Sequence, residues 1–160
     1  MEPRESYRLV SPTELPYAHN PYRCAHRARY VDLLRAECGL APDGPWPSDA
    51  TRSNERAAGR SFDASLSCDD RAACPYHRGD WQLAASAAIT ALREAEDWDP
   101  WGLRDCFEQL ALDEATARWA ESLLTHPIRW AEGAEYLTNG QHRACALRHS
   151  GAPAVPVLTP

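Results

Sequence analysis

The pentapeptide "NGQHR" at residues 139–143 gathers residue types that bind phosphate into one short stretch. It follows the apolar segment "EYLT" and opens a helical segment at 141–150, so a glycine lies where a helix begins. The first N–H groups of a helix have no partner within it, and the helix dipole places partial positive charge there. Gly140 lets the backbone approach a ligand, while His142 and Arg143 can donate charge-assisted hydrogen bonds to an anion. The spacing therefore predicts a phosphate or carboxylate site at this turn.

A second interpretation of these residues is purely structural. Asn139 and Gly140 form a common turn dipeptide, and His142 and Arg143 could be the solvated start of a helix. Asn139 and Gln141 offer neutral donors and acceptors that suit either interpretation. Spacing alone is equally compatible with a phosphate turn and with an ordinary helix start.

The elements that must position this turn are predicted from periodicity and capping residues. Asp80 and Asp99 are expected to cap the helices that follow them, and Pro100 suits the first helical position. The Pro-rich and Gly-rich region 41–78 shows little periodicity and is expected to be irregular. Helices are predicted at 27–38, 81–96, 99–110, 113–124 and 141–150, and short strands at 7–10, 127–130, 135–138 and 154–158.

Composition bounds the class of protein. The chain has 160 residues, 44% hydrophobic and 25% charged, which fits one globular domain. The net charge is −6 and all 17 basic residues are arginine, so non-specific nucleic-acid binding is not favoured. No apolar run approaches the roughly 20 residues that span a bilayer, so no membrane partner is expected. The amino terminus, "MEPRESYRLV", has no apolar signal region, which makes a cytoplasmic location the expectation.

The carboxy-terminal part of the chain resembles a known superfamily. Its segment "HPIRWAEGAEYLTNGQHRACALRHSGAPAVPV" (126–157) is similar to the ParB-like and sulfiredoxin-like superfamily, in which a "PI" strand and a Gly turn precede a His-Arg helix start. "NGQHR" also resembles the signature of DGQHR-domain proteins associated with DNA phosphorothioation, with Asn139 in place of the aspartate. A weaker resemblance lies in "RLVSPTELPYAHNPYR" (8–23), which looks like the ParB-family strand, turn and Asn-Pro box that ends in arginine.

The resemblance implies an α+β fold with a small mixed sheet of the ParB/sulfiredoxin type. Residues 1–160 would form a single domain whose ParB-like core consists of 7–26 and 113–158. The remaining residues, 27–112, would be a mostly helical, partly irregular insertion that carries a Cys/His-containing loop.

The same resemblance implies a nucleotide ligand, ATP, ADP or CTP, bound with Mg²⁺. Sulfiredoxin activity itself is not expected, because the reactive cysteine of that family falls where this chain has Gln141. Cys145 is then interpreted as a small buried apolar side chain. Transferred by position, the residues implied to hold the nucleotide are Asn139, which orients the turn, and Gly140, Gln141, His142, Arg143 and Arg23, which contact phosphate.

Cysteine and histidine residues form a second candidate site. Cys24 and His26 make a C-x-H pair, while Cys68, Cys74 and His77 make C-x5-C-x2-H within "CDDRAACPYH". Zinc prefers thiolate and imidazole ligands in tetrahedral sets, and a Pro-rich loop would be stabilised by such an ion. Four of these five residues could therefore bind a structural zinc. The alternative is that they are ordinary reduced thiols and imidazoles, because the spacing matches no standard zinc finger.

Two functions follow from these sites. In the first, the protein is an enzyme that hydrolyses a nucleotide or transfers its phosphoryl group. Arg143 and the helix N–H groups would stabilise the phosphate charge, and His142 would be a phosphate ligand or an acid/base catalyst. In the second, it is a non-catalytic module that recognises nucleic acid or a partner protein, with the zinc loop as a contact surface.

Overall fold

Three short strands form one mixed sheet in the computed structural model, which describes residues 6–94 and 100–159. The strands are β1 (Ser6–Val10), β2 (Ile128–Arg129) and β3 (Val155–Thr159). β3 lies in the centre, antiparallel to β1 and parallel to β2. The first and last described segments of the chain therefore pair with each other, with Ser6 opposite Thr159.

Seven α-helices and two 3₁₀ turns surround this sheet in the described part of the chain. The first three helices are α1 (Arg27–Glu37), α2 (Arg52–Ser65) and α3 (Cys68–Ala73). The other four are α4 (Trp81–Glu94), α5 (Pro100–Gln109), α6 (Glu114–Thr125) and α7 (Gln141–Arg148). The 3₁₀ turns are η1 (Pro12–Glu14) and η2 (Pro75–His77). The predicted α+β class is confirmed.

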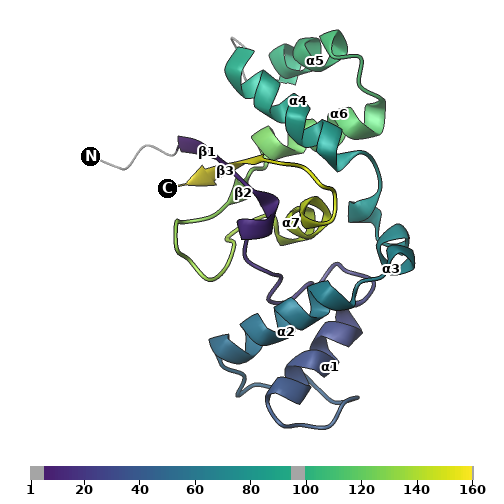
Figure 1. Ribbon diagram of the computed structural model, residues 1–160, viewed down its shortest axis with the longest axis vertical. Helices are drawn as coiled ribbons and strands as arrows, with labels where there is room; N and C mark the ends of the chain where they lie inside the picture. The colour runs from purple at the N-terminus through teal and green to yellow at the C-terminus, as the bar shows by residue number, and fades with distance from the viewer. Residues whose placement is uncertain (1–5, 95–99, 160) are drawn as a thin grey trace.

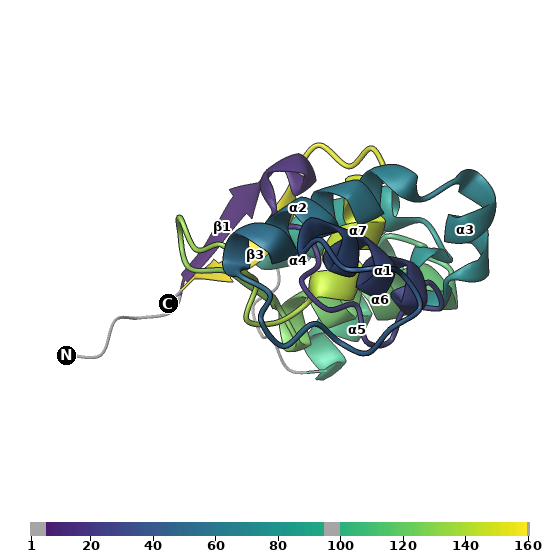
Figure 2. The ribbon, with the colours of Figure 1, turned by 90° about the horizontal axis from the view of Figure 1, so that it is seen from below.

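The elements lie in three groups along the long axis of the molecule. Figure 1 shows α4, α5 and α6 at one end, the sheet with α7 in the middle, and α1 with α2 at the other end. Figure 2 views the molecule from the end that carries α1 and α2, with α7 behind them. α7 is thus placed between the two helical groups.

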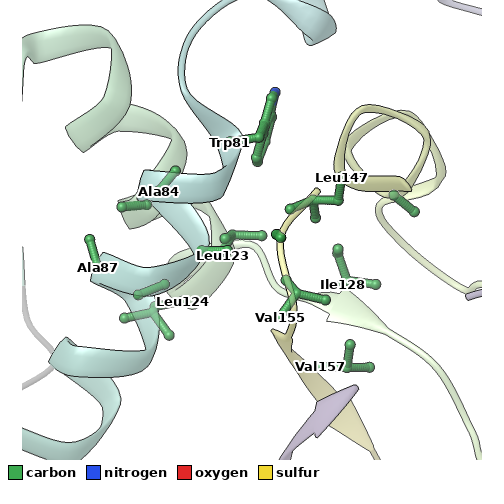
Figure 3. Close-up of a cluster of buried hydrophobic side chains, with 14 of the residues drawn as sticks. Trp81, Ala84, Ala87, Leu123, Leu124, Ile128, Leu147, Val155 and Val157 are labelled. Carbon is green, nitrogen blue, oxygen red and sulfur yellow. The ribbon is translucent and has the colours of Figure 1, made fainter. Parts of the chain in front are cut away.

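The main core joins the sheet to α4, α6 and α7. Alanines such as Ala84 and Ala88 give α4 a buried face without bulk, so larger side chains can pack against it closely. Leu123 of α6, Leu147 of α7 and Val155 of β3 fill the space that this leaves, and each is fully buried. Figure 3 shows these side chains pointing toward one another from the helices and the strand. This core therefore anchors α7 to the sheet and to α4 and α6.

A second, smaller core lies between α1 and α2. Tyr30 and Leu34 of α1 pack against Ala58 and Phe62 of α2, and Leu66 closes the cluster. The Tyr30 and Phe62 rings meet edge to face with centroids 5.9 Å apart. The middle of the chain is therefore packed as well as helical.

The structure corrects two expectations from sequence and leaves one outside the described residues. Region 41–78 is not irregular, because α2, α3 and η2 all lie in it. The capping boxes at Thr51 and Ser67 begin α2 and α3, which outweighs the weak periodicity of their sequences. Segment 135–138 is not a strand: it forms bends, and the isolated bridge to β2 joins Arg129 to Asn139, the residue that follows the segment. The Asp99 cap falls outside the described residues.

Candidate functional site

The turn before α7 is held from two directions. Gly140 is the N-cap of α7 and has a left-handed φ of 93°. Asn139 Nδ2 donates to the carbonyl oxygen of Pro127 at 2.8 Å, which fixes the turn against the segment that leads into β2. On the other side, Gln141 Nε2 donates to Asn20 O at 3.0 Å, and Gln141 Oε1 accepts from His19 N at 3.3 Å. Both side-chain amides therefore position the turn, and no capping side chain covers the first N–H groups of α7.

Arg143 is a buried cation beside this turn. Its side chain is only 8% exposed, and Nη1 donates to Ser122 O in the last turn of α6 at 2.7 Å. Within residues 6–94 and 100–159, no carboxylate lies within ion-pair distance of its guanidinium. Burial lowers the pKa of Arg143, yet arginine remains protonated in proteins at neutral pH. The hydrogen bond to the Ser122 carbonyl is thus the main interaction that offsets the cost of burying this charge, and one such bond offsets only a small part of it.

A pocket of about 290 Å³ opens at this turn. Its walls are the segment 137–143, the amino-terminal residues His19, Tyr22 and Arg23, and Tyr76 from η2. The ionisable side chains other than tyrosine in this lining are arginine and histidine, and none of the lining residues is aspartate or glutamate. The pocket is accordingly basic although the whole chain carries a net charge of −6.

His142 forms an aromatic wall of the pocket. Its ring stacks on Tyr76 with centroids 4.8 Å apart, and Tyr22 meets it edge-on at 5.4 Å. Burial, with a smaller contribution from the Arg23 charge, lowers the pKa of His142 to about 4. Its Nε2 is buried and has no hydrogen-bond partner in the described part of the chain. At neutral pH the imidazole is therefore uncharged and can accept a proton or share a hydrogen bond, but cannot supply positive charge to a phosphate.

The His142 ring should remain neutral well below the ordinary histidine range. We expect its NMR resonances to titrate near pH 4, since protonation would place a charge between two aromatic rings and beside Arg23. Because the folded-state pKa lies below the unfolded one, protonation favours unfolding as the pH falls from about 6.5 toward 4. Tyr76→Ala, which exposes the ring, should raise this pKa toward its ordinary value. A wild-type midpoint near 6.5 would contradict the burial described for His142.

The Cys and His residues singled out in the sequence are only partly brought together. Cys24, His26, Cys74 and His77 line one small cavity, whereas Cys68 is exposed and its Sγ accepts from Arg71 at 3.1 Å. The His26 ring is already engaged with Asp70, whose carbonyl oxygen lies 3.1 Å from Nε2 and whose carboxylate lies 3.8 Å from it.

The structure adds a group that sequence reasoning missed. Asp63 of α2, Cys145 of α7 and His149, the C-cap of α7, could hold a metal ion, because their ligand atoms all lie within 4.8 Å of one another. Cys145 also lines the small cavity, and its Sγ lies 3.4 Å from His77 Nε2. The spacing of Cys145 and His149, four residues apart on one helix face, is the signal that could have indicated this group.

The fold and the site together define a small α+β protein with a basic pocket at a helix N-terminus and a thiol-rich cavity beside it. No family model, no curated protein and no solved structure matches the chain. In the described residues, no helix combines the length and apolar character needed to cross a membrane. The likeness to the ParB/sulfiredoxin superfamily stays a prediction.

Proposed function

We propose that the protein binds a nucleotide, with its phosphate at the turn formed by residues 139–143. The observation that carries this proposal is the buried Arg143, which faces the pocket lining without a carboxylate partner among the described residues. An uncompensated buried cation is costly, and a phosphate oxygen beside it would supply the missing opposite charge. Arg23, which is exposed at the same pocket, would provide a second positive charge.

The turn is built for close approach of an anion. A Cβ atom at Gly140 would lie 3.3 Å from Arg143 Nη2, so the guanidinium and the glycine backbone are direct neighbours. A phosphate in this position could accept from the guanidinium and from the first N–H groups of α7 together. The nucleoside would extend toward Tyr22, whose side chain is 59% exposed and can stack on a base.

The reaction proposed for this site is nucleotide hydrolysis or phosphoryl transfer. Arg143 and the α7 N–H groups would stabilise charge on the phosphoryl oxygens, and neutral His142 would accept a proton from the attacking group. Mg²⁺ would enter bound to the nucleotide phosphates, because the pocket lining supplies no carboxylate to hold it beforehand. That same lack of carboxylates favours a non-catalytic module, which would bind a nucleotide at this turn without turnover.

Calorimetric titration tests this proposal directly. Purified protein should bind at least one of ATP, ADP, CTP and GTP in the presence of Mg²⁺, and inorganic pyrophosphate should compete for the site. Affinity should fall as salt is added, since two arginines face the anion. Phosphate release, measured in parallel, separates the enzyme from the binding module. Absence of binding by all four nucleotides would refute the proposed function.

A further inference from the structure

Apart from His26 and Asp70, which contact each other, four side chains with zinc-binding chemistry line one small cavity beside α7. Three are thiols, from Cys24, Cys74 and Cys145, and the fourth is the His77 imidazole. The free space is about 10 Å³, which is close to the room that a single water-sized particle needs. In Figure 1, α3 and the turn that follows it lie beside α7, which brings the middle of the chain to this cavity.

One pair of side chains in the cavity has the separation that two ligands have in a tetrahedral metal site. Cys145 Sγ and His77 Nε2 are 3.4 Å apart. Zinc–sulfur and zinc–nitrogen bonds at a tetrahedral angle would separate such a pair by about 3.5 Å. Cys24 and Cys74 line the same cavity, and zinc would draw their Sγ atoms toward this pair, because no three of the four ligand atoms lie within 4.8 Å of one another.

We propose that one zinc ion binds in this cavity, held by Cys24, Cys74, His77 and Cys145. A three-cysteine, one-histidine set is a common structural zinc site. Binding would release the thiol protons to solvent, leaving a site with a net charge of −1 from three thiolates and one Zn²⁺.

The surroundings of the cavity suit that negative charge. Arg71 lines the cavity and would offset part of that charge, while the Asp70 carboxylate in the same lining is paired with Arg29. The backbone N–H of His26 donates to Cys24 Sγ at 3.4 Å, which also favours a thiolate at that position.

The other possible ligands are already engaged. The Asp63 carboxylate pairs with Arg148 Nε at 3.1 Å and lies 3.3 Å from His149 Nε2. A metal bound by Asp63, Cys145 and His149 would therefore share the carboxylate with Arg148, which already holds Oδ1. The thiol set involves no such competition, and it joins three segments that are remote in sequence.

The proposed zinc would also order the walls of the basic pocket. Arg23 directly precedes Cys24, and Tyr76 lies between Cys74 and His77, so both ligand-bearing segments carry pocket residues. The metal assignment rests on the cavity alone and does not depend on nucleotide binding.

The test is metal analysis of the full chain. Protein purified without added metal should contain stoichiometric zinc by mass spectrometry of the elements. Cobalt substituted for zinc should give the intense visible bands of a tetrahedral site and a sulfur-to-cobalt charge-transfer band. Protein that holds only trace zinc and gives no such cobalt spectrum would overturn the proposal. This arm uses wild-type protein, so it holds even if a ligand variant fails to fold.

Variants then identify the ligands. Cys74→Ser and His77→Ala should lose zinc, while Cys68→Ser, a cysteine that does not line the cavity, should keep it. His149→Gln distinguishes the thiol set from the Asp63, Cys145 and His149 group, because His149 belongs only to the second. Retention of zinc by His149→Gln supports the thiol set, whereas loss of zinc by His149→Gln with retention by Cys74→Ser would overturn it in favour of the Asp63 group.

Discussion

Arg143→Met should weaken nucleotide binding by about 30-fold or more, because losing one partner of a buried charge pair costs about 2–5 kcal/mol. Methionine keeps much of the side-chain volume and removes the guanidinium that faces the pocket. The unliganded protein should lose little stability, since the variant also removes a buried charge that has no carboxylate partner in the described residues. The Ser122 carbonyl keeps the hydrogen bond from His126 N at 3.1 Å. Calorimetric titration and urea denaturation measure the two effects separately.

The matched control for this variant is Arg60→Met. Arg60 is exposed on α2 and does not line the pocket, so the same change in charge should leave affinity nearly unaltered. Arg143→Lys is expected to fall between wild type and Arg143→Met, because lysine keeps the charge and loses the planar fork. If Arg143→Met binds nucleotide with wild-type affinity, the phosphate does not bind at this turn and Arg143 has only a structural role.

Segments whose signals are local could be predicted from the sequence. The Ala-rich helix at Trp81–Glu94 and the capped helix at Glu114–Thr125 both follow from composition and a capping aspartate. α2 was missed because its apolar residues are few and Gly59 interrupts them. The residues of α1 against which α2 packs precede it in the chain and are separated from it by a loop. Only the folded structure shows that Phe62 is buried against them. The local cue that was available was the Thr51 capping box.

In the candidate site too, features set by local sequence could be predicted and features set by tertiary packing could not. A helix start after the Asn139-Gly140 turn was predictable, because a glycine and a preceding polar residue determine it locally. The burial of Arg143 could not be predicted from local sequence. It depends on the position of the last turn of α6, whose Ser122 carbonyl accepts the hydrogen bond from Arg143. The sequence interpretation of Cys145 is a small buried apolar side chain, whereas in the structure it is half-buried, and burial raises the pKa of its thiol to about 12. Its approach to His77, 68 positions away, arises only from tertiary packing.

Gly140→Ala should destabilise the fold by about 2–5 kcal/mol, for two additive reasons. The φ of 93° lies in the left-handed region, which costs a residue with a Cβ about 1–2 kcal/mol. The new Cβ would also lie 2.8 Å from Ile128 Cγ1 and 3.2 Å from Ile128 Cα, and overpacking of this kind costs about 1–3 kcal/mol. Ile128 is fully buried in β2, so it has little room to move. The free energy of unfolding, measured in urea, gives the size of the loss.

Gly151→Ala separates the two causes. Gly151 has a similar φ of 77°, but a Cβ there meets no atom within 4 Å, so only the backbone cost of about 1–2 kcal/mol should appear. The difference between the two variants then measures the contact with Ile128. In an Ile128→Ala background, which removes Cγ1, the effect of Gly140→Ala should shrink toward that of Gly151→Ala. Equal losses in the two glycine variants would show that β2 yields to the new side chain, and that close packing against Ile128 does not require glycine at the turn.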